Sequence, residues 1–355
     1  MWEKPNHCYN AYVELINPPT RAPELPSSPW INTYETISLS NLYGKVVLLN
    51  FWDFTSINCI RTLPNLRTWQ HRYIEHFTIL GIHTPKFSFS GDVSLLKSTT
   101  GRLGISWPVI MDADQKIWEA YGTRCWPTMT LIDKQGRIRF RHEGEGKYIE
   151  IARAIQSLIH EIDPSIQMEE PHNPLREEDR PDAPCIQRTT ELHTDSIVKY
   201  DALSHEPTPM QLPSEYSINK IYLQGDWVQE HDGVMLVSAE GTISLQYRGA
   251  RCYAILSPNP STISDVHYER DPVKISVKQD ENPLSPECFG EDIQMIDETS
   301  YLLIDMPRLY HLVQNPSVDD YTITLHLKTP GITFYAFSFV SNISEDVNLR
   351  LAVKE

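Results

Sequence analysis

A proline-rich acidic stretch at residues 163–195 divides the chain. It holds five prolines, with nine acidic residues against three arginines, and shows no apolar periodicity. Proline fixes the backbone and an excess of like charge keeps a segment extended in water. We therefore predict a stiff, solvated linker here and two folding units, residues 1–162 and residues 196–355, a domain count that 355 residues also favour.

Charge is unevenly distributed between these parts. Residues 1–162 carry 15 acidic and 17 basic residues, whereas residues 196–355 carry 23 acidic and 11 basic ones. The overall net charge of −16 would repel phosphates, so we expect no nucleic-acid partner. No run reaches the ~18 apolar residues of a membrane span, and no secretory signal is visible. We expect a cytoplasmic protein, or an extracytoplasmic or periplasmic one if the chain was truncated.

The six cysteines show no metal-binding or disulfide framework. They lie far apart, at Cys8, Cys59, Cys125, Cys185, Cys252 and Cys288. The sequence has no C-x-x-C and no paired Cys/His spacing, which a structural zinc site needs. We therefore expect no metal and no cofactor.

The first unit alternates strand and helix patterns. The continuous apolar run Val46–Phe51 is typical of a buried parallel strand, and a helix is predicted from Ser56 to His76. Pro64 falls inside that helix and should bend it. The remaining predicted elements are strands at Thr78–His83, Met129–Ile132 and Arg137–Arg141, and helices at Asp114–Tyr121 and Tyr148–Ile162. The pattern indicates an α/β fold.

The second unit is dominated by short strand patterns separated by turn residues. The predicted strands are Val234–Ser238, Thr242–Arg248, Arg251–Ser257, Val273–Gln279, Ile293–Ile296, Tyr301–Asp305, Tyr321–Lys328 and Ile332–Val340. So many short strands favour an all-β, antiparallel sandwich of the jelly-roll type.

The residues that could carry chemistry lie where the first strand meets the first helix. Val46–Phe51 leads into a helix that starts at Ser56-Ile-Asn-Cys59, and a later strand is preceded by Trp126-Pro127-Thr128. This layout resembles the thioredoxin-like (redoxin) family. The resemblance implies a thioredoxin fold, with Ser56 and Cys59 at the active-site motif. It also places Pro127 at the cis-proline whose neighbouring backbone holds an extended substrate.

The resemblance is strongest to DipZ-type proteins and extends over most of the chain. It is carried by Trp30–Asn32, Phe51–Pro64, Gly81–Phe89, Trp126–Tyr148, Arg308–Val313 and Gly331–Phe339. The likeness implies that the second unit is a β-sandwich akin to carbohydrate-binding modules. The membrane-embedded domain of DipZ-type proteins has no counterpart in this sequence.

The motif departs from the family at its first position. In the family a cysteine there attacks the substrate, because the helix N-terminus acidifies its thiol. Here that position is Ser56, while Cys59 matches the resolving cysteine. Serine is a good N-cap, so the fold should persist. Dithiol exchange through Ser56 and Cys59 alone is excluded.

Three interpretations of this departure stay open. In the first, the protein is a thiol–disulfide oxidoreductase acting on protein disulfides or redox partner proteins, and the nucleophile was lost by engineering or naturally. In the second, it is a redox-inactive binding protein for a protein or carbohydrate ligand. In the third, Cys125, two residues before Pro127, pairs with Cys59.

Other side chains are expected beside the motif. His83 ends a strand at the edge where parallel sheets gather ligands, so it could shuttle a proton or order its turn. Asn58 lies within the motif. Trp52 and Trp126 are interpreted either as a rim that receives a partner's segment or as packing residues.

Aromatic residues of the second unit are candidates for sugar binding. Trp227, Tyr247 and Tyr310 could stack on sugar rings, or they could pack in the core of the sandwich, as aromatics in small β domains more often do.

Overall fold

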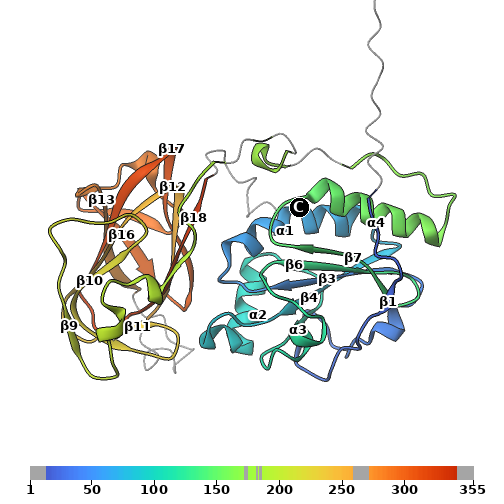
Figure 1. The fold of residues 1–355 in the computed structure, drawn as a ribbon, viewed down its shortest axis with the longest axis horizontal. Coiled ribbons are helices and arrows are strands. Elements are labelled where there is room, and N and C mark those ends of the chain that lie inside the picture. Colours follow the sequence, from blue (N-terminus) through green and yellow to red (C-terminus); the bar gives the residue numbers. More distant parts are fainter. Residues whose placement is uncertain (1–12, 172–174, 181–182, 184–185, 259–271, 342–355) are drawn as a thin grey trace, which may run out of the picture.

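The computed structural model shows an α/β domain and a β domain side by side (Figure 1). It describes all residues except 1–12, 172–174, 181–182, 184–185, 259–271 and 342–355. Among the described residues, no helix has the length and apolar character needed to cross a membrane.

The α/β domain is built on a seven-stranded sheet in the order β1-β7-β6-β3-β4-β5-β2. Its strands are β1 Thr20–Arg21, β2 Trp30–Ile31, β3 Val46–Trp52, β4 Phe77–His83, β5 Val109–Met111, β6 Thr128–Ile132 and β7 Arg137–Glu143. Strands β3, β4 and β5 are parallel, whereas β6 and β7 run antiparallel beside β3. This is the predicted thioredoxin-like arrangement, and the fold class is confirmed for this domain.

Helices cover both faces of this sheet. They are α1 Ile57–Arg72, α2 Val93–Arg102, α3 Lys116–Ala120 and α4 Tyr148–Ile162, with 3₁₀ turns η1 Leu39–Leu42 and η2 Ser88–Gly91. Successive side chains of a strand point to opposite faces. Val46 and Leu48 of β3 therefore pack with α1 and α4, while Val47 and Leu49 pack with Ile117 of α3. Because both faces are covered, every residue of β3 is buried.

The second domain is all-β, as predicted, in the part of the chain that the structure describes. Its strands are β8 Leu192–His193, β9 Thr208–Met210, β10 Ile221–Gln229, β11 Val234–Leu236, β12 Gly241–Ser257, β13 Val273–Gln279, β14 Asn282–Pro283, β15 Ile293–Ile296, β16 Thr299–Ile304, β17 Arg308–Leu327 and β18 Thr333–Val340. The main path of the sheet is β15-β16-β13-β17-β12-β10-β11-β18-β8. Strand β12 also pairs with β18, so the sheet folds over a single apolar core.

The stretch at 163–195 is not solvated throughout, in contrast to the prediction. Arg176 is buried against the α/β domain, next to the 3₁₀ turn η3 Glu177–Asp179, because acidic groups surround its guanidinium. Toward its end, β8 pairs with β18 of the second domain. Parts of this acidic stretch are therefore packed onto both domains.

Candidate functional site

Ser56 occupies the N-cap position of α1, directly after the loop that follows the buried strand β3. Its backbone is extended, with φ −87° and ψ 113°, which allows the chain to turn into the helix. The expected capping hydrogen bond is absent, since the Ser56 hydroxyl accepts no bond from the first turn of α1. The Ser56 carbonyl accepts from the Cys59 amide at 3.0 Å and from the Ile60 amide at 3.1 Å, which starts the helix.

Cys59 is a fully buried free thiol. Burial raises the pKa of Cys59 to about 12, and the smaller influence of the neighbouring Ser56 side chain and Asp53 backbone acts in the opposite direction. The thiol is therefore protonated at neutral pH and is not a nucleophile in this state. This shielded character suits the resolving position that the resemblance gives it.

Asp53, which the sequence interpretation missed, is the carboxylate nearest the motif. It is fully buried, and Oδ1 accepts from the Thr55 amide at 2.7 Å and from the Thr55 hydroxyl. Oδ2 accepts from the Lys86 amide at 3.0 Å and from the Ser90 hydroxyl at 2.7 Å. Asp53 thus joins the loop before α1 to the loop after β4. The sequence feature that could have indicated Asp53 is an Asx-turn pattern directly after the apolar strand, in which threonine follows the aspartate by two residues.

His83 lies in an aromatic environment next to Asp53. Its ring stacks on Phe54 at 5.2 Å and meets Trp52 edge-on at 5.3 Å, and Nε2 lies 3.6 Å from Asp53 Oδ2. Burial lowers the pKa of His83 to about 4, although the charge of Asp53 acts in the opposite direction. The ring is therefore neutral at physiological pH, and neither ring nitrogen has a hydrogen-bond partner among the described residues.

The two tryptophans that were candidates for a rim have different surroundings. Trp52 is 1% exposed, so a rim that receives a partner cannot include it; it belongs to the core because both faces of β3 are covered. Trp126 is half-buried, donates Nε1–H to the Thr84 carbonyl at 3.0 Å and packs against Trp118 at 4.3 Å. Trp126 thus lies on the loop that precedes β6.

The same loop carries Pro127 and Cys125. The Trp126–Pro127 peptide bond is cis, and Pro127 is buried. The half-buried Cys125 thiol lies 3.7 Å from the Thr128 hydroxyl, within its own loop. Cys125 and Cys59 are both free thiols, so this structure contains no bond between them.

The sugar-stacking interpretation of the β-domain aromatics is wrong. Trp227, Tyr247 and Tyr310 are all completely buried in the apolar core of that domain. Their polar atoms are satisfied internally, by the Gln224 carbonyl at 3.0 Å, by Gln279 at 3.0 Å and by Asp305 at 2.9 Å, respectively. Flat aromatic surfaces that could meet a sugar are therefore not available at these positions.

The motif opens onto a cavity that both domains form. Ser56 is only 6% exposed, and it borders a cavity of about 240 Å³ together with Ile57 and the half-buried Asn58. The opposite wall consists of residues from the segment that precedes β8 and from strand β18: Arg188, Thr190, Glu191, Ser338 and Phe339. Sequence patterns gave no signal for this wall, since its residues are remote in the chain.

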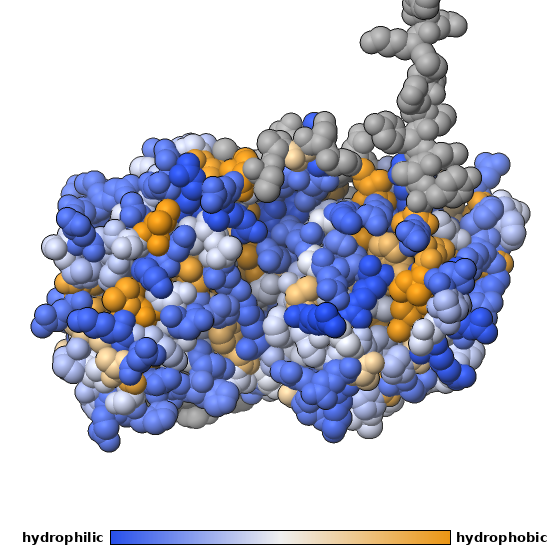
Figure 2. All heavy atoms as spheres, in the orientation of Figure 1, coloured by the Kyte–Doolittle hydropathy of each residue, from blue (hydrophilic) through white to orange (hydrophobic). Residues whose placement is uncertain are grey.

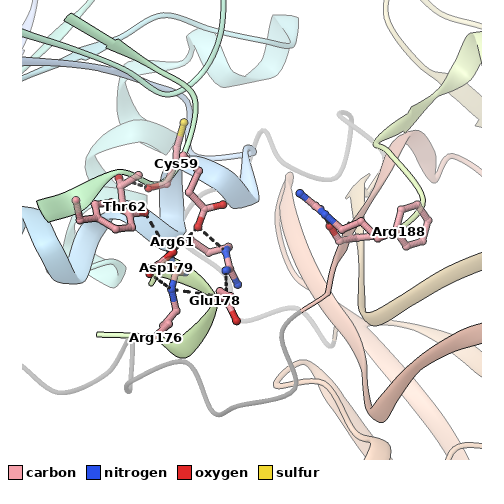
Figure 3. A network of polar contacts seen from close by, with 10 residues as sticks. Cys59, Arg61, Thr62, Arg176, Glu178, Asp179 and Arg188 are labelled. Atoms are coloured by element: carbon pink, nitrogen blue, oxygen red, sulfur yellow. Dashed lines mark hydrogen bonds and ion pairs between the residues drawn. The ribbon is translucent and has the colours of Figure 1, made fainter. Parts of the chain in front are cut away.

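A buried ionic cluster lies beside the motif on α1 (Figure 3). Glu145 Oε1 accepts from Arg61 Nε and from Arg176 Nη2, both at 2.7 Å. Arg61 also pairs with Glu178, and Arg176 Nε bonds to Asp179 at 2.8 Å. Because Arg61 of α1 and Arg176 of the acidic stretch bind the same carboxylate, that stretch is held against α1. Arg61 lies only two residues after Cys59. Arg188 approaches from the β domain, where it bonds to the Phe339 carbonyl.

Two family profiles match the chain. That of the AhpC/TSA family covers residues 20–141, and that described as a thioredoxin-like C-terminal domain covers residues 194–339. Together they include the motif and most of the β domain.

The curated proteins with related sequences are longer than the part of them that this chain matches. The chain is 28% identical to protein DipZ of Mycobacterium bovis over 258 residues, which is 71% of this chain and 37% of DipZ. It is 37% identical to human NHL repeat-containing protein 2 over 128 residues, 35% of this chain and 18% of that protein. It is 31% identical to the thiol-disulfide oxidoreductase ResA of Halalkalibacterium halodurans over 31% of this chain and 60% of ResA. The chain thus spans little more than a third of the length of DipZ.

Proposed function

We propose that this chain, as a member of the thioredoxin-like, thiol–disulfide oxidoreductase family, is built for exchange with protein disulfides. It lacks the attacking thiol, because serine stands at position 56. The observation that carries this proposal is the placement of Ser56 at the N-cap of α1, three residues before the fully buried Cys59. The Cα atoms of residues three apart in a helical turn lie about 5 Å apart, within the roughly 4.4–6.8 Å between Cα atoms that a disulfide spans. A sulfur at position 56 would therefore face its resolving partner.

The chemistry that the site would perform with cysteine at position 56 is two-step exchange. The thiolate at 56 attacks one sulfur of the substrate disulfide, a mixed disulfide forms, and the other substrate sulfur leaves as a thiolate that takes up a proton. Cys59 then loses its proton and attacks the sulfur at 56, which releases the second substrate thiol. The substrate gains two electrons, and residues 56 and 59 end as a disulfide. The hydroxyl of Ser56 can do none of this.

Insulin reduction by dithiothreitol tests the proposal. We expect the chain with Ser56 to match the uncatalysed rate and Ser56→Cys to exceed it by about tenfold or more, a barrier change of ~1.4 kcal/mol. Ser56→Cys with Cys59→Ala should lose turnover, because the mixed disulfide is no longer resolved. A folded Ser56→Cys protein that accelerates the reduction of neither insulin nor a small disulfide such as 2-hydroxyethyl disulfide would contradict the proposal.

Two alternatives predict other outcomes in the same assay. If Cys59 and Cys125 form the working pair, the parent chain itself is active and Cys125→Ala abolishes that activity. If the protein only binds its partners, Ser56→Cys stays inactive and the partner is retained without exchange. The protonated state of Cys59 and the serine at position 56 argue against exchange by the chain as it stands.

A further inference from the structure

The β domain is docked on the loop that follows β4, residues 84–91. Lys86 forms an ion pair with Glu191, and the Ser88 amide donates to Asp232 Oδ2 at 2.5 Å. Burial alone would raise the pKa of Glu191, but His193 and Lys86 lower it to about 2, so this carboxylate stays charged at any physiological pH. Polar contacts thus tie the two domains together at this loop.

Apolar contacts reinforce the same junction. Tyr335 of β18 lies 5.2 Å from the ring of Phe87 and 4.9 Å from that of Phe89. The core of the α/β domain also continues into the β domain, where it includes residues of β12, β17 and β18: Tyr253, Ile255, Leu309, Tyr335, Ala336 and Val340. This continuity means that the domains share one buried apolar cluster at their contact.

The docking loop is connected to the motif by Asp53. One oxygen of that carboxylate accepts from Lys86 and Ser90 in the docking loop, and the other from Thr55, next to Ser56. The contact with the β domain and the position of residue 56 are therefore fixed by the same buried group.

Docking leaves limited space at residue 56. The cavity there holds only about 240 Å³, and Ser56 itself is 6% exposed. A stable contact with a folded protein needs about 800 Å² of accessible surface on each partner, and the docked β domain covers the surface around Ser56. We propose that the β domain selects the substrates that reach residue 56: small thiol or disulfide compounds enter while the domains are docked, and disulfides of folded proteins enter only after they separate. The inference rests on the proposed function insofar as residue 56 is taken as the reacting position.

Size-graded labelling of Ser56→Cys tests this selection without any catalytic step. The probes are N-ethylmaleimide, which is smaller than the cavity, and a cysteine-free folded protein that carries one maleimide. Labelled peptides are identified by mass spectrometry, with the parent chain as background for the other cysteines. Tyr34→Cys supplies an exposed reference on the same domain.

At each thiol we compare the labelling rate of the small probe with that of the large probe. We expect this ratio to be about tenfold or more higher at position 56 than at the reference thiol, because the large probe must wait for domain opening. Lys86→Glu with Tyr335→Ala should bring the two ratios together, since like charges then face each other and the aromatic contact is lost. The matched control is Lys86→Arg with Tyr216→Ala, which keeps the ion pair and removes a tyrosine that contacts Tyr222 within its own domain.

Equal ratios at position 56 and at the reference position in the docked protein would overturn the inference. A ratio that does not respond to the opening variant, with both domains shown to be folded by circular dichroism, would overturn it as well. Failure of the proposed function looks different: labelling remains size-selective, but Ser56→Cys does not reduce insulin even in the opened background.

Discussion

At the scale of single residues, the candidate site combines a buried acid, a buried neutral imidazole and a buried thiol. Asp53 is held by amide and hydroxyl donors from two loops, and His83 is enclosed by Phe54 and Trp52. Cys59 lies one turn beyond Ser56 with its proton retained. Burial therefore determines the charge state of His83 and Cys59, and each makes a measurable prediction.

Acid should destabilise the protein through His83. Its pKa is about 4 in the folded state and about 6.5 when unfolded, so between these values the unfolded chain binds more protons. The contribution of His83 to the free energy of unfolding is fully present above about pH 6.5 and decreases by about 3 kcal/mol as the pH falls toward 4. Urea unfolding of the parent and of His83→Phe at several pH values measures this. The same acid dependence in both proteins would contradict it, and His76→Phe, just before the same strand, is the control.

Cys59 should resist alkylation in the folded chain. With a pKa of about 12 and no exposure, its thiol should react with iodoacetamide near pH 8 far more slowly than the half-buried Cys125. Peptide mapping after timed quenching measures both sites in one sample. Modification of the two at similar rates would show that Cys59 is accessible or ionised.

At the scale of elements, strong periodicity predicted structure well. The strands β3 and β4 were expected because their apolar runs have strand length, and the helix α4 because its apolar residues recur at helical spacing. Helix α2 was not predicted, since Gly101 and a run of polar residues weaken its pattern. Strand β12 was predicted as two strands because the sequence around Gly249 is typical of a turn. In the structure the strand continues there, with a shift in register between Gly249 and Arg251.

The ionic cluster around Glu145 is the least predictable element contact, because its arginines come from distant segments. Glu145→Gln should lower the free energy of unfolding by about 1–3 kcal/mol, since the buried Arg61 and Arg176 lose the negative charge that they share at Glu145. The neighbouring Glu143, which pairs with Arg141 at the surface, provides the control, and Glu143→Gln should change stability by less than about 1 kcal/mol. Equal effects in denaturant unfolding would show that the cluster contributes nothing beyond a surface pair.

At the scale of the whole molecule, the second domain changes what the motif can meet. The sequence indicated two units and the fold class of each. The hydrophobic pattern of each unit accounts for that unit's own core, so it gives no indication that the two domains contact each other. The view in Figure 2 shows a mostly hydrophilic face on both domains, with apolar residues in separate groups. The shared cluster around Tyr335 is instead buried between the domains, where only the structure could reveal it.

The most direct test of the central claim is whether a disulfide forms between positions 56 and 59. Ser56→Cys is incubated with 2-hydroxyethyl disulfide, and the pairing is located by peptide mass spectrometry. We predict a disulfide that joins the thiol introduced at position 56 to Cys59. Dithiothreitol should reverse it, and the parent chain cannot form it. Two free or separately modified thiols at these positions in a folded Ser56→Cys protein would contradict it.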